Sequence, residues 1–146
     1  MIRAIAMAAA AFSILACVPA APRAPEVAPA NTVVFARFGE EVRPGGVRVQ
    51  PLRIVEDSRC PQSVQCVHAG TVRIAVRVVE GGAARETVLT LREPEPVGGG
   101  RVLRLVGVCP HAPAPGRPLA TGAYRFQLTV DRDGEPVAPH PMCTPT

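Results

Sequence analysis

Cysteine side chains are the first candidates for chemistry in this chain of 146 residues. Besides Cys17 there are four of them: Cys60, Cys66, Cys109 and Cys143. An even number of cysteines in a small exported domain is typical of a disulfide framework, although four cysteines allow three pairings that the sequence does not distinguish. We favour Cys60–Cys66, because these two enclose a short loop that begins with proline. The remaining pair, Cys109–Cys143, would then pin the C-terminal segment.

A metal site is the alternative use of the same side chains, because thiolate, imidazole and thioether groups together suit Cu(I). Three groups have this composition: Cys66 with His68, Cys109 with His111, and His140 with Met142 and Cys143. Nothing in the sequence brings the three groups together, and zinc-finger spacing is absent. An oxidising compartment also favours disulfides over thiolates. We therefore expect no cofactor, and a periplasmic copper or zinc protein is the first alternative.

Asp57 and Arg59 lie at the start of the cysteine loop. A carboxylate and a guanidinium this close usually form a local turn contact or an exposed ion pair that contributes less than about 1 kcal/mol. The functional alternative is an inhibitor or receptor module in which the loop 58–67 displays Arg59, with Asp57 and His68 beside it. A rigid loop binds well because little conformational entropy is lost on docking.

No arrangement of residues typical of an enzyme is present. The sequence lacks the G-x-S-x-G and H-E-x-x-H patterns. The paired carboxylates Glu40–Glu41 and Glu93/Glu95 stand near glycine or proline and are explained by solvated charge. We expect no enzymatic activity.

The N-terminal residues predict where the protein is located and are not expected to contribute to its fold. Arg3 precedes an uncharged apolar stretch, 4–15, that is too short to span a bilayer. The stretch ends in Ile-Leu-Ala-Cys17, which resembles the lipobox of bacterial lipoproteins. We expect residues 1–16 to be a cleaved signal peptide and Cys17 to be lipidated, since acyl chains contribute about 0.8 kcal/mol per buried CH₂ to membrane binding. The alternative is an ordinary secretory signal that is cut after Ala20.

The segment after Cys17 consists almost entirely of proline and alanine up to residue 30. This composition favours extended polyproline II and predicts a semi-stiff tether at residues 17–30, followed by one domain at 31–146. Val18 directly follows Cys17, at the position where an aspartate would retain a Gram-negative lipoprotein in the inner membrane. We therefore expect the protein to be anchored in the outer membrane.

Residues 31–146 follow the pattern of an all-β domain. Hydrophobic residues make up 47% of the chain but aromatic residues only 3%, so the core must be built from aliphatic side chains. The 17 prolines and 13 glycines argue against long helices. The net charge of +4 comes from scattered arginines without a contiguous basic face, and we expect no binding to nucleic acid.

Two segments alternate clearly between apolar and polar residues, and four more do so less clearly. In 71–80 one face carries Val72, Ile74, Val76 and Val78. In 123–131 Tyr124 and Phe126 lie on the face expected to be buried, and the opposite face, with Gln127, Thr129 and Asp131, is expected to be wet. The less clear strands are 32–38, 47–55, 85–92 and 101–108, with a bulge or break expected at Gln50–Pro51. Segments 94–100 and 110–118 are expected to be loops. About six strands predict a small antiparallel β-sandwich or open barrel pinned by disulfides.

The run EDSRCPQSVQCVHAGTVRIAV, residues 56–76, resembles the signature of an uncharacterised family of small bacterial exported lipoproteins. Members of this family show D-S-R-C-P, a short spacer, and C-V-W-A-G that leads into a strand. This chain departs from the pattern at His68, where the family usually has tryptophan, and in carrying Cys109 and Cys143. The resemblance implies no activity. The expected function is therefore a lipid-anchored interaction or structural module of the cell envelope, on the periplasmic or surface side, with a membrane and an envelope protein as partners.

Overall fold

Strands dominate the part of the chain that the structure, a computed structural model, describes: residues 24–61, 64–68, 70–112, 117, 119–132 and 137–138. The strands are β1 (Val27–Ala28), β2 (Val34–Ala36), β3 (Arg43–Pro44), β4 (Arg48–Asp57), β5 (Val72–Glu80), β6 (Ala83–Thr90), β7 (Pro94–Val97), β8 (Arg101–Cys109) and β9 (Arg125–Asp131). One 3₁₀ turn, η1 (Thr121–Ala123), precedes β9. Within these described residues, no helix has the length and apolarity that a membrane span requires.

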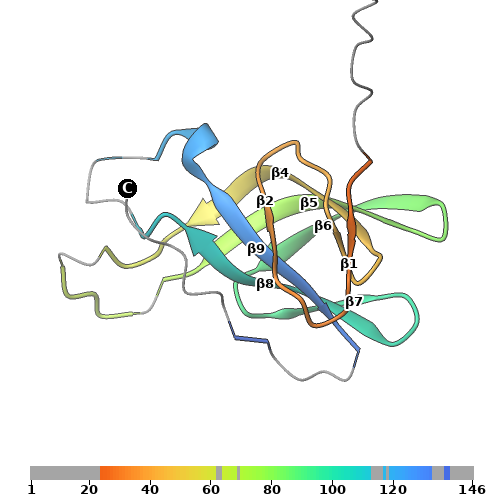
Figure 1. The fold of residues 1–146 in the computed structure, drawn as a ribbon. Helices are drawn as coiled ribbons and strands as arrows, with labels where there is room; N and C mark the ends of the chain where they lie inside the picture. Colours follow the sequence, from red (N-terminus) through yellow and green to blue (C-terminus); the bar gives the residue numbers. More distant parts are fainter. Residues whose placement is uncertain are drawn as a thin grey trace, which may run out of the picture.

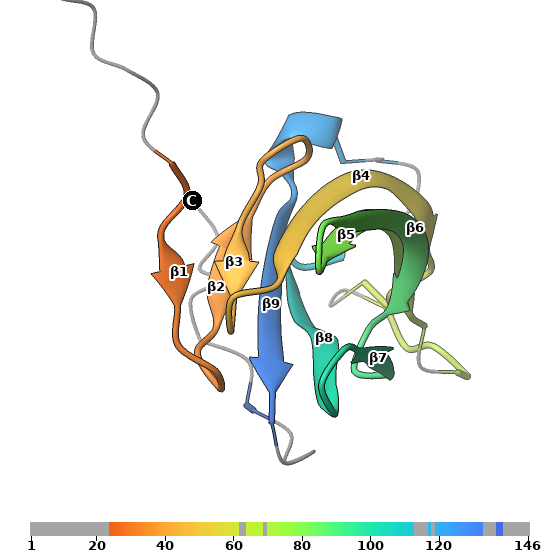
Figure 2. The same ribbon diagram turned by 90° about the vertical axis from the view of Figure 1, so that its right-hand side faces the viewer.

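Two antiparallel sheets face each other, as Figures 1 and 2 show. One has the strand order β2-β9-β8-β7 and the other the order β4-β5-β6, while β1 and β3 form a short parallel pair beside them. Strands β4, β5 and β6 curve over the larger sheet (Figure 2), and the two sheets do not close into one barrel. This arrangement confirms the predicted all-β antiparallel fold, with β1, β3 and β7 as additional short strands.

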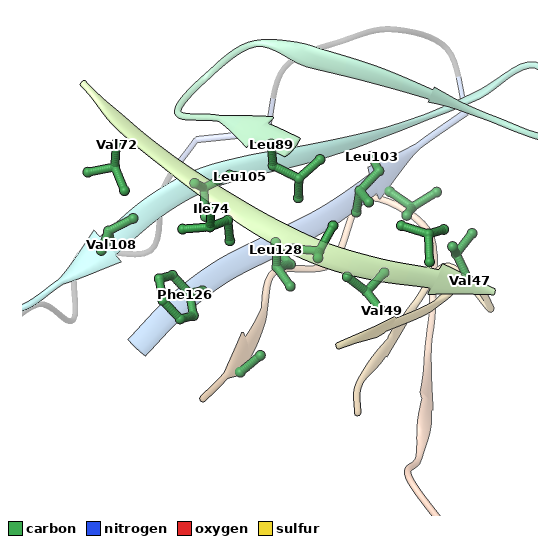
Figure 3. Close-up of a cluster of buried hydrophobic side chains, with 14 of the residues drawn as sticks. Val47, Val49, Val72, Ile74, Leu89, Leu103, Leu105, Val108, Phe126 and Leu128 are labelled. Carbon is green, nitrogen blue, oxygen red and sulfur yellow. The ribbon is translucent and has the colours of Figure 1, made fainter. Parts of the chain in front are cut away.

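The core lies between the two sheets (Figure 3). As predicted, β5 turns its alternate aliphatic residues from Val72 to Val78 inward, while Arg73 and Arg77 remain exposed. The inward-facing aliphatic residues of β5 pack with Leu128 and Phe126 of β9 and with the leucines of β8. Each fully buried side chain of this size contributes about 1.5–3 kcal/mol relative to an exposed one, so the aliphatic core compensates for the scarcity of aromatic residues.

The outward face of β9 is buried, which corrects the expectation of a wet face. Gln127, Thr129 and Asp131 are all buried. Asp131 accepts a hydrogen bond of 2.7 Å from Nε of Arg104 on the neighbouring strand. Gln127 lies directly over Gly107, where an added Cβ would come within 2.7 Å of its side-chain oxygen. Alternation therefore predicted the strand correctly, but β9 is an interior strand whose polar residues are hydrogen-bonded instead of solvated.

Two segments that were expected to lack regular structure contain strands. β7 lies within the predicted loop 94–100, and β1 lies within the predicted tether 17–30. β7 is an edge strand, paired only with β8. Its two prolines are two residues apart, so both nitrogens point to the same side, and an edge strand has one side that needs no donors. β1 is held by its parallel pairing with β3, which local composition could not reveal.

The break expected near Gln50–Pro51 is confirmed. The register between β4 and β5 shifts between Pro51 and Arg53, and again between Ile54 and Glu56. Val49 consequently stays in the core although the strand changes parity after it. The two shifts accompany the strong curvature of β4 (Figure 2) and direct its end toward the cysteine loop.

Candidate functional site

The loop between β4 and β5 is closed by a disulfide between Cys60 and Cys66, as predicted, with their Cα atoms 5.9 Å apart. The chain enters the loop from Asp57, the last residue of β4, and leaves it toward Val72, the first residue of β5. The loop extends from the end of the sandwich, drawn in yellow-green in Figures 1 and 2.

The side chain of Arg59 points into the protein interior. Its guanidinium donates two parallel hydrogen bonds of 2.8 Å to the Asp57 carboxylate. Its Nη1 donates to the carbonyls of Val108, at 3.0 Å, and Pro110, at 2.7 Å. The side chains of Arg59 and Asp57 are only 12% and 10% exposed. The local contact between Asp57 and Arg59 is therefore present, but it is buried and not exposed. The alternative in which the loop displays Arg59 to a partner is wrong, because the planar guanidinium joins the loop to the end of β8.

Tyr124 completes this buried cluster. Its hydroxyl donates a hydrogen bond of 3.0 Å to Oδ2 of Asp57. Burial alone would raise the pKa of Asp57, but the hydrogen bonds and charge of Arg59, with the Tyr124 hydroxyl, lower it below its usual value. Burial, followed by the hydrogen bond to Asp57 and its negative charge, raises the pKa of Tyr124 to about 12. The cluster therefore holds one fixed charge state across the neutral pH range.

Ser58 and Thr71 close the base of the loop. The Ser58 amide donates to the Thr71 carbonyl at 2.8 Å, and the Thr71 amide donates to the Ser58 hydroxyl at 3.1 Å. The backbone of Gly70 passes so close that an added Cβ would lie 1.5 Å from the Ser58 carbonyl oxygen. No residue with a side chain fits there. This close contact explains why the motif has glycine at this position.

The tip of the loop, defined here as residues 64–68, is exposed. Val67 is 92% exposed and Val64 43% exposed, and His68 also faces solvent. The five residues Val-Gln-Cys-Val-His carry no carboxylate or guanidinium. A single exposed valine is unremarkable on a protein surface. Here, however, two valines lie on a segment that a disulfide, an arginine clamp and a glycine contact all hold in place.

The proposed metal ligands are not brought together in the described residues. Cys60 and Cys66 are bonded to each other, and Cys109 is also disulfide-bonded. The Cys66/His68 and Cys109/His111 pairs therefore offer no free thiol. Among the described residues no three His, Cys, Asp or Glu side chains form a group that could hold a metal. His140, Met142, Cys143 and the predicted lipidation site Cys17 lie outside the described residues, so the Cys109–Cys143 pairing stays a prediction.

A hollow of about 460 Å³ lies on another part of the surface, between the segments around β1, β2 and β3. Val27, Val34 and Val42 form its apolar walls. Two carboxylates at its rim are already engaged: Glu40 accepts from the Arg37 amide at 2.9 Å, and Glu41 from Arg43 at 3.5 Å. These local contacts explain the paired acidic residues without a catalytic role.

No protein-family model matches this chain, and no curated protein and no solved structure matches it. The loop itself is therefore the basis on which a function can be inferred. Of its exposed residues, the sequence had singled out His68 but missed Val64 and Val67. Their apolar character within a short cysteine-bounded loop, where no strand can bury them, is the signal that could have found them. Nothing in the sequence indicated that Tyr124 contacts Asp57.

Proposed function

We propose that this protein is a lipid-anchored, non-enzymatic interaction module of the bacterial cell envelope, and that the loop tip is its contact surface. One observation carries the proposal: Val67 is 92% exposed at the tip of a loop whose base is fixed. Asp57, Ser58, Arg59 and Gly70, which belong to the motif, all serve to hold the loop. The residues of the tip remain open to a partner.

Fixing the loop before binding favours affinity. An ordered loop has already lost the rotational freedom that a flexible loop would lose on docking, which is about 0.5–1.5 kcal/mol for each immobilised side chain. Burying one valine in a partner then contributes about 1.5–3 kcal/mol. Because the tip carries no charged side chain of fixed sign, docking does not require a carboxylate or guanidinium to be desolvated.

Export supports the same proposal. Disulfides persist in oxidising compartments, and the Cys60–Cys66 bond is consistent with the signal sequence and with Cys17 as the lipidation site. Attachment to the outer membrane, on the periplasmic or surface side, is inferred from Val18. The resemblance of residues 56–76 to a family of exported lipoproteins points to the same compartment.

The proposal is tested by a matched pair of variants, Val67→Ser in the tip and Val27→Ser in β1. Both valines are exposed, at 92% and 56%, so neither change removes a core side chain. Each variant replaces the native protein in its own cells, and the proteins that co-purify after mild solubilisation are quantified by mass spectrometry. The amount of each protein that co-purifies with the wild type should fall at least tenfold with Val67→Ser and should be unchanged with Val27→Ser. If both variants retain the same amounts of co-purifying proteins, the loop tip is not the contact surface.

A further inference from the structure

The loop and the start of the domain lie on opposite sides of the molecule. In Figure 1, β1 lies on the right and the loop on the left. In Figure 2, after a rotation of 90°, β1 lies on the left and the loop at the lower right. Since the two views agree, the strand that receives the N-terminal segment and the loop tip are separated across the width of the domain. The chain therefore enters the fold from the side that faces away from the loop.

The segment between the lipidation site and β1 is short. Val27 follows Cys17 by ten positions, which span at most about 36 Å when fully extended. A domain of roughly 100 residues has a radius of gyration of about 13 Å, equivalent to a sphere with a radius of about 17 Å. For the loop to touch the anchoring membrane, the segment would have to cross a quarter of that sphere and then descend by one radius to the lipid surface, a path of about 44 Å. It is too short for that path.

We propose that the loop tip is held away from the membrane that carries the anchor and binds a protein in the aqueous space, in an uncharged, apolar pocket that receives Val67. This inference deepens the proposed function and depends on it. The absence of Asp, Glu, Lys and Arg from residues 64–68 fits a pocket of this kind. It does not fit an anionic lipid surface, which attracts clusters of basic residues.

The lipidated full-length protein tests this orientation when a photo-cross-linking amino acid replaces Gln65 in the tip or Glu26 beside β1. Both positions are exposed, and both replacements leave Val67 in place. One sample is reconstituted in vesicles of phosphatidylethanolamine and phosphatidylglycerol, and acylation of Cys17 is verified by intact mass. A second sample is irradiated in intact cells, with and without the additional Val67→Ser change.

The expected lipid adducts in vesicles are at least tenfold fewer at position 65 than at position 26. In cells, position 65 should give protein adducts that fall at least tenfold with Val67→Ser. Equal lipid adducts at the two positions would overturn the orientation, even if Val67→Ser still abolishes co-purification and the proposed function stands. Protein adducts at position 65 that are indifferent to Val67→Ser would overturn the apolar pocket.

Discussion

Arg59 and Asp57 face each other through two parallel hydrogen bonds of 2.8 Å, from Nε to Oδ1 and from Nη2 to Oδ2. The third nitrogen of the guanidinium reaches the carbonyls of Val108 and Pro110, at the end of β8. One side chain thus ties the start of the cysteine loop to the opposite sheet. Because the residues of this clamp come from the two sheets, the position of the loop depends on the folded sandwich and not on the disulfide alone.

Arg59→Ala should lower the free energy of unfolding by about 3 kcal/mol, because it leaves the Asp57 carboxylate without its ion pair and two carbonyls without a donor. Urea unfolding measures the change. The control is Arg53→Ala, which removes the exposed ion pair with Glu86, whose side chains are 60% and 51% exposed. That change should cost less than about 1 kcal/mol. Similar losses for both variants would show that Arg59 is not a structural clamp.

Gly70→Ala should destabilise the protein by about 2–3 kcal/mol, because a methyl group there would collide with the Ser58 carbonyl and force the base of the loop open. Gly122→Ala is the matched control, since an added Cβ at that position meets nothing within 4 Å. Thermal unfolding of the two variants compares them directly. A Gly70→Ala protein as stable as the Gly122→Ala protein would contradict the close contact.

Tyr124 is the only tyrosine in the chain, so its ionisation can be followed by ultraviolet absorbance without interference. We expect a pKa of about 12 in the folded protein, raised by burial and by the Asp57 carboxylate. A raised pKa means that folding favours the neutral phenol. Its contribution to stability is complete below the unfolded value of about 10 and is lost as the pH rises through about 12.

Asp57→Asn should bring the Tyr124 pKa part of the way back toward 10, because the negative charge is removed while burial remains. A wild-type titration midpoint near 10 would show that the phenol does not contact Asp57. An unchanged midpoint in Asp57→Asn would show that burial alone sets the pKa.

The sequence predicted those parts of the fold that depend on alternation and turn chemistry. The inward face of β5 and the disulfide between Cys60 and Cys66 followed from local patterns. The wet face assigned to β9 was wrong, because alternation shows that a strand has two kinds of face and not that the polar one meets water. Asp131 is buried against Arg104, a partner 27 residues away that no local pattern identifies.

The candidate site was predicted in position but not in its details. The motif around Asp57 and Arg59 located the loop, but the direction of the arginine depended on the carbonyls of Val108 and Pro110, about 50 residues further along the chain. The short strand β1 was missed for the same reason, because it exists through its pairing with β3. Strand β7 pairs with its neighbour β8 across a glycine turn, and it was missed because the prolines and glycines of 94–100 predicted a loop.

Amide order parameters of residues 64–68, measured by ¹⁵N relaxation of the oxidised full-length protein, test most directly whether the loop tip is presented in one conformation. If the arginine clamp and the disulfide fix the tip, these amides should give values of about 0.8, close to those of rigid backbone, and lower values in Arg59→Ala. Values below about 0.6 in the wild-type protein would mean that the tip is flexible on the fast timescale. A preorganised contact surface at Val67 would then be contradicted.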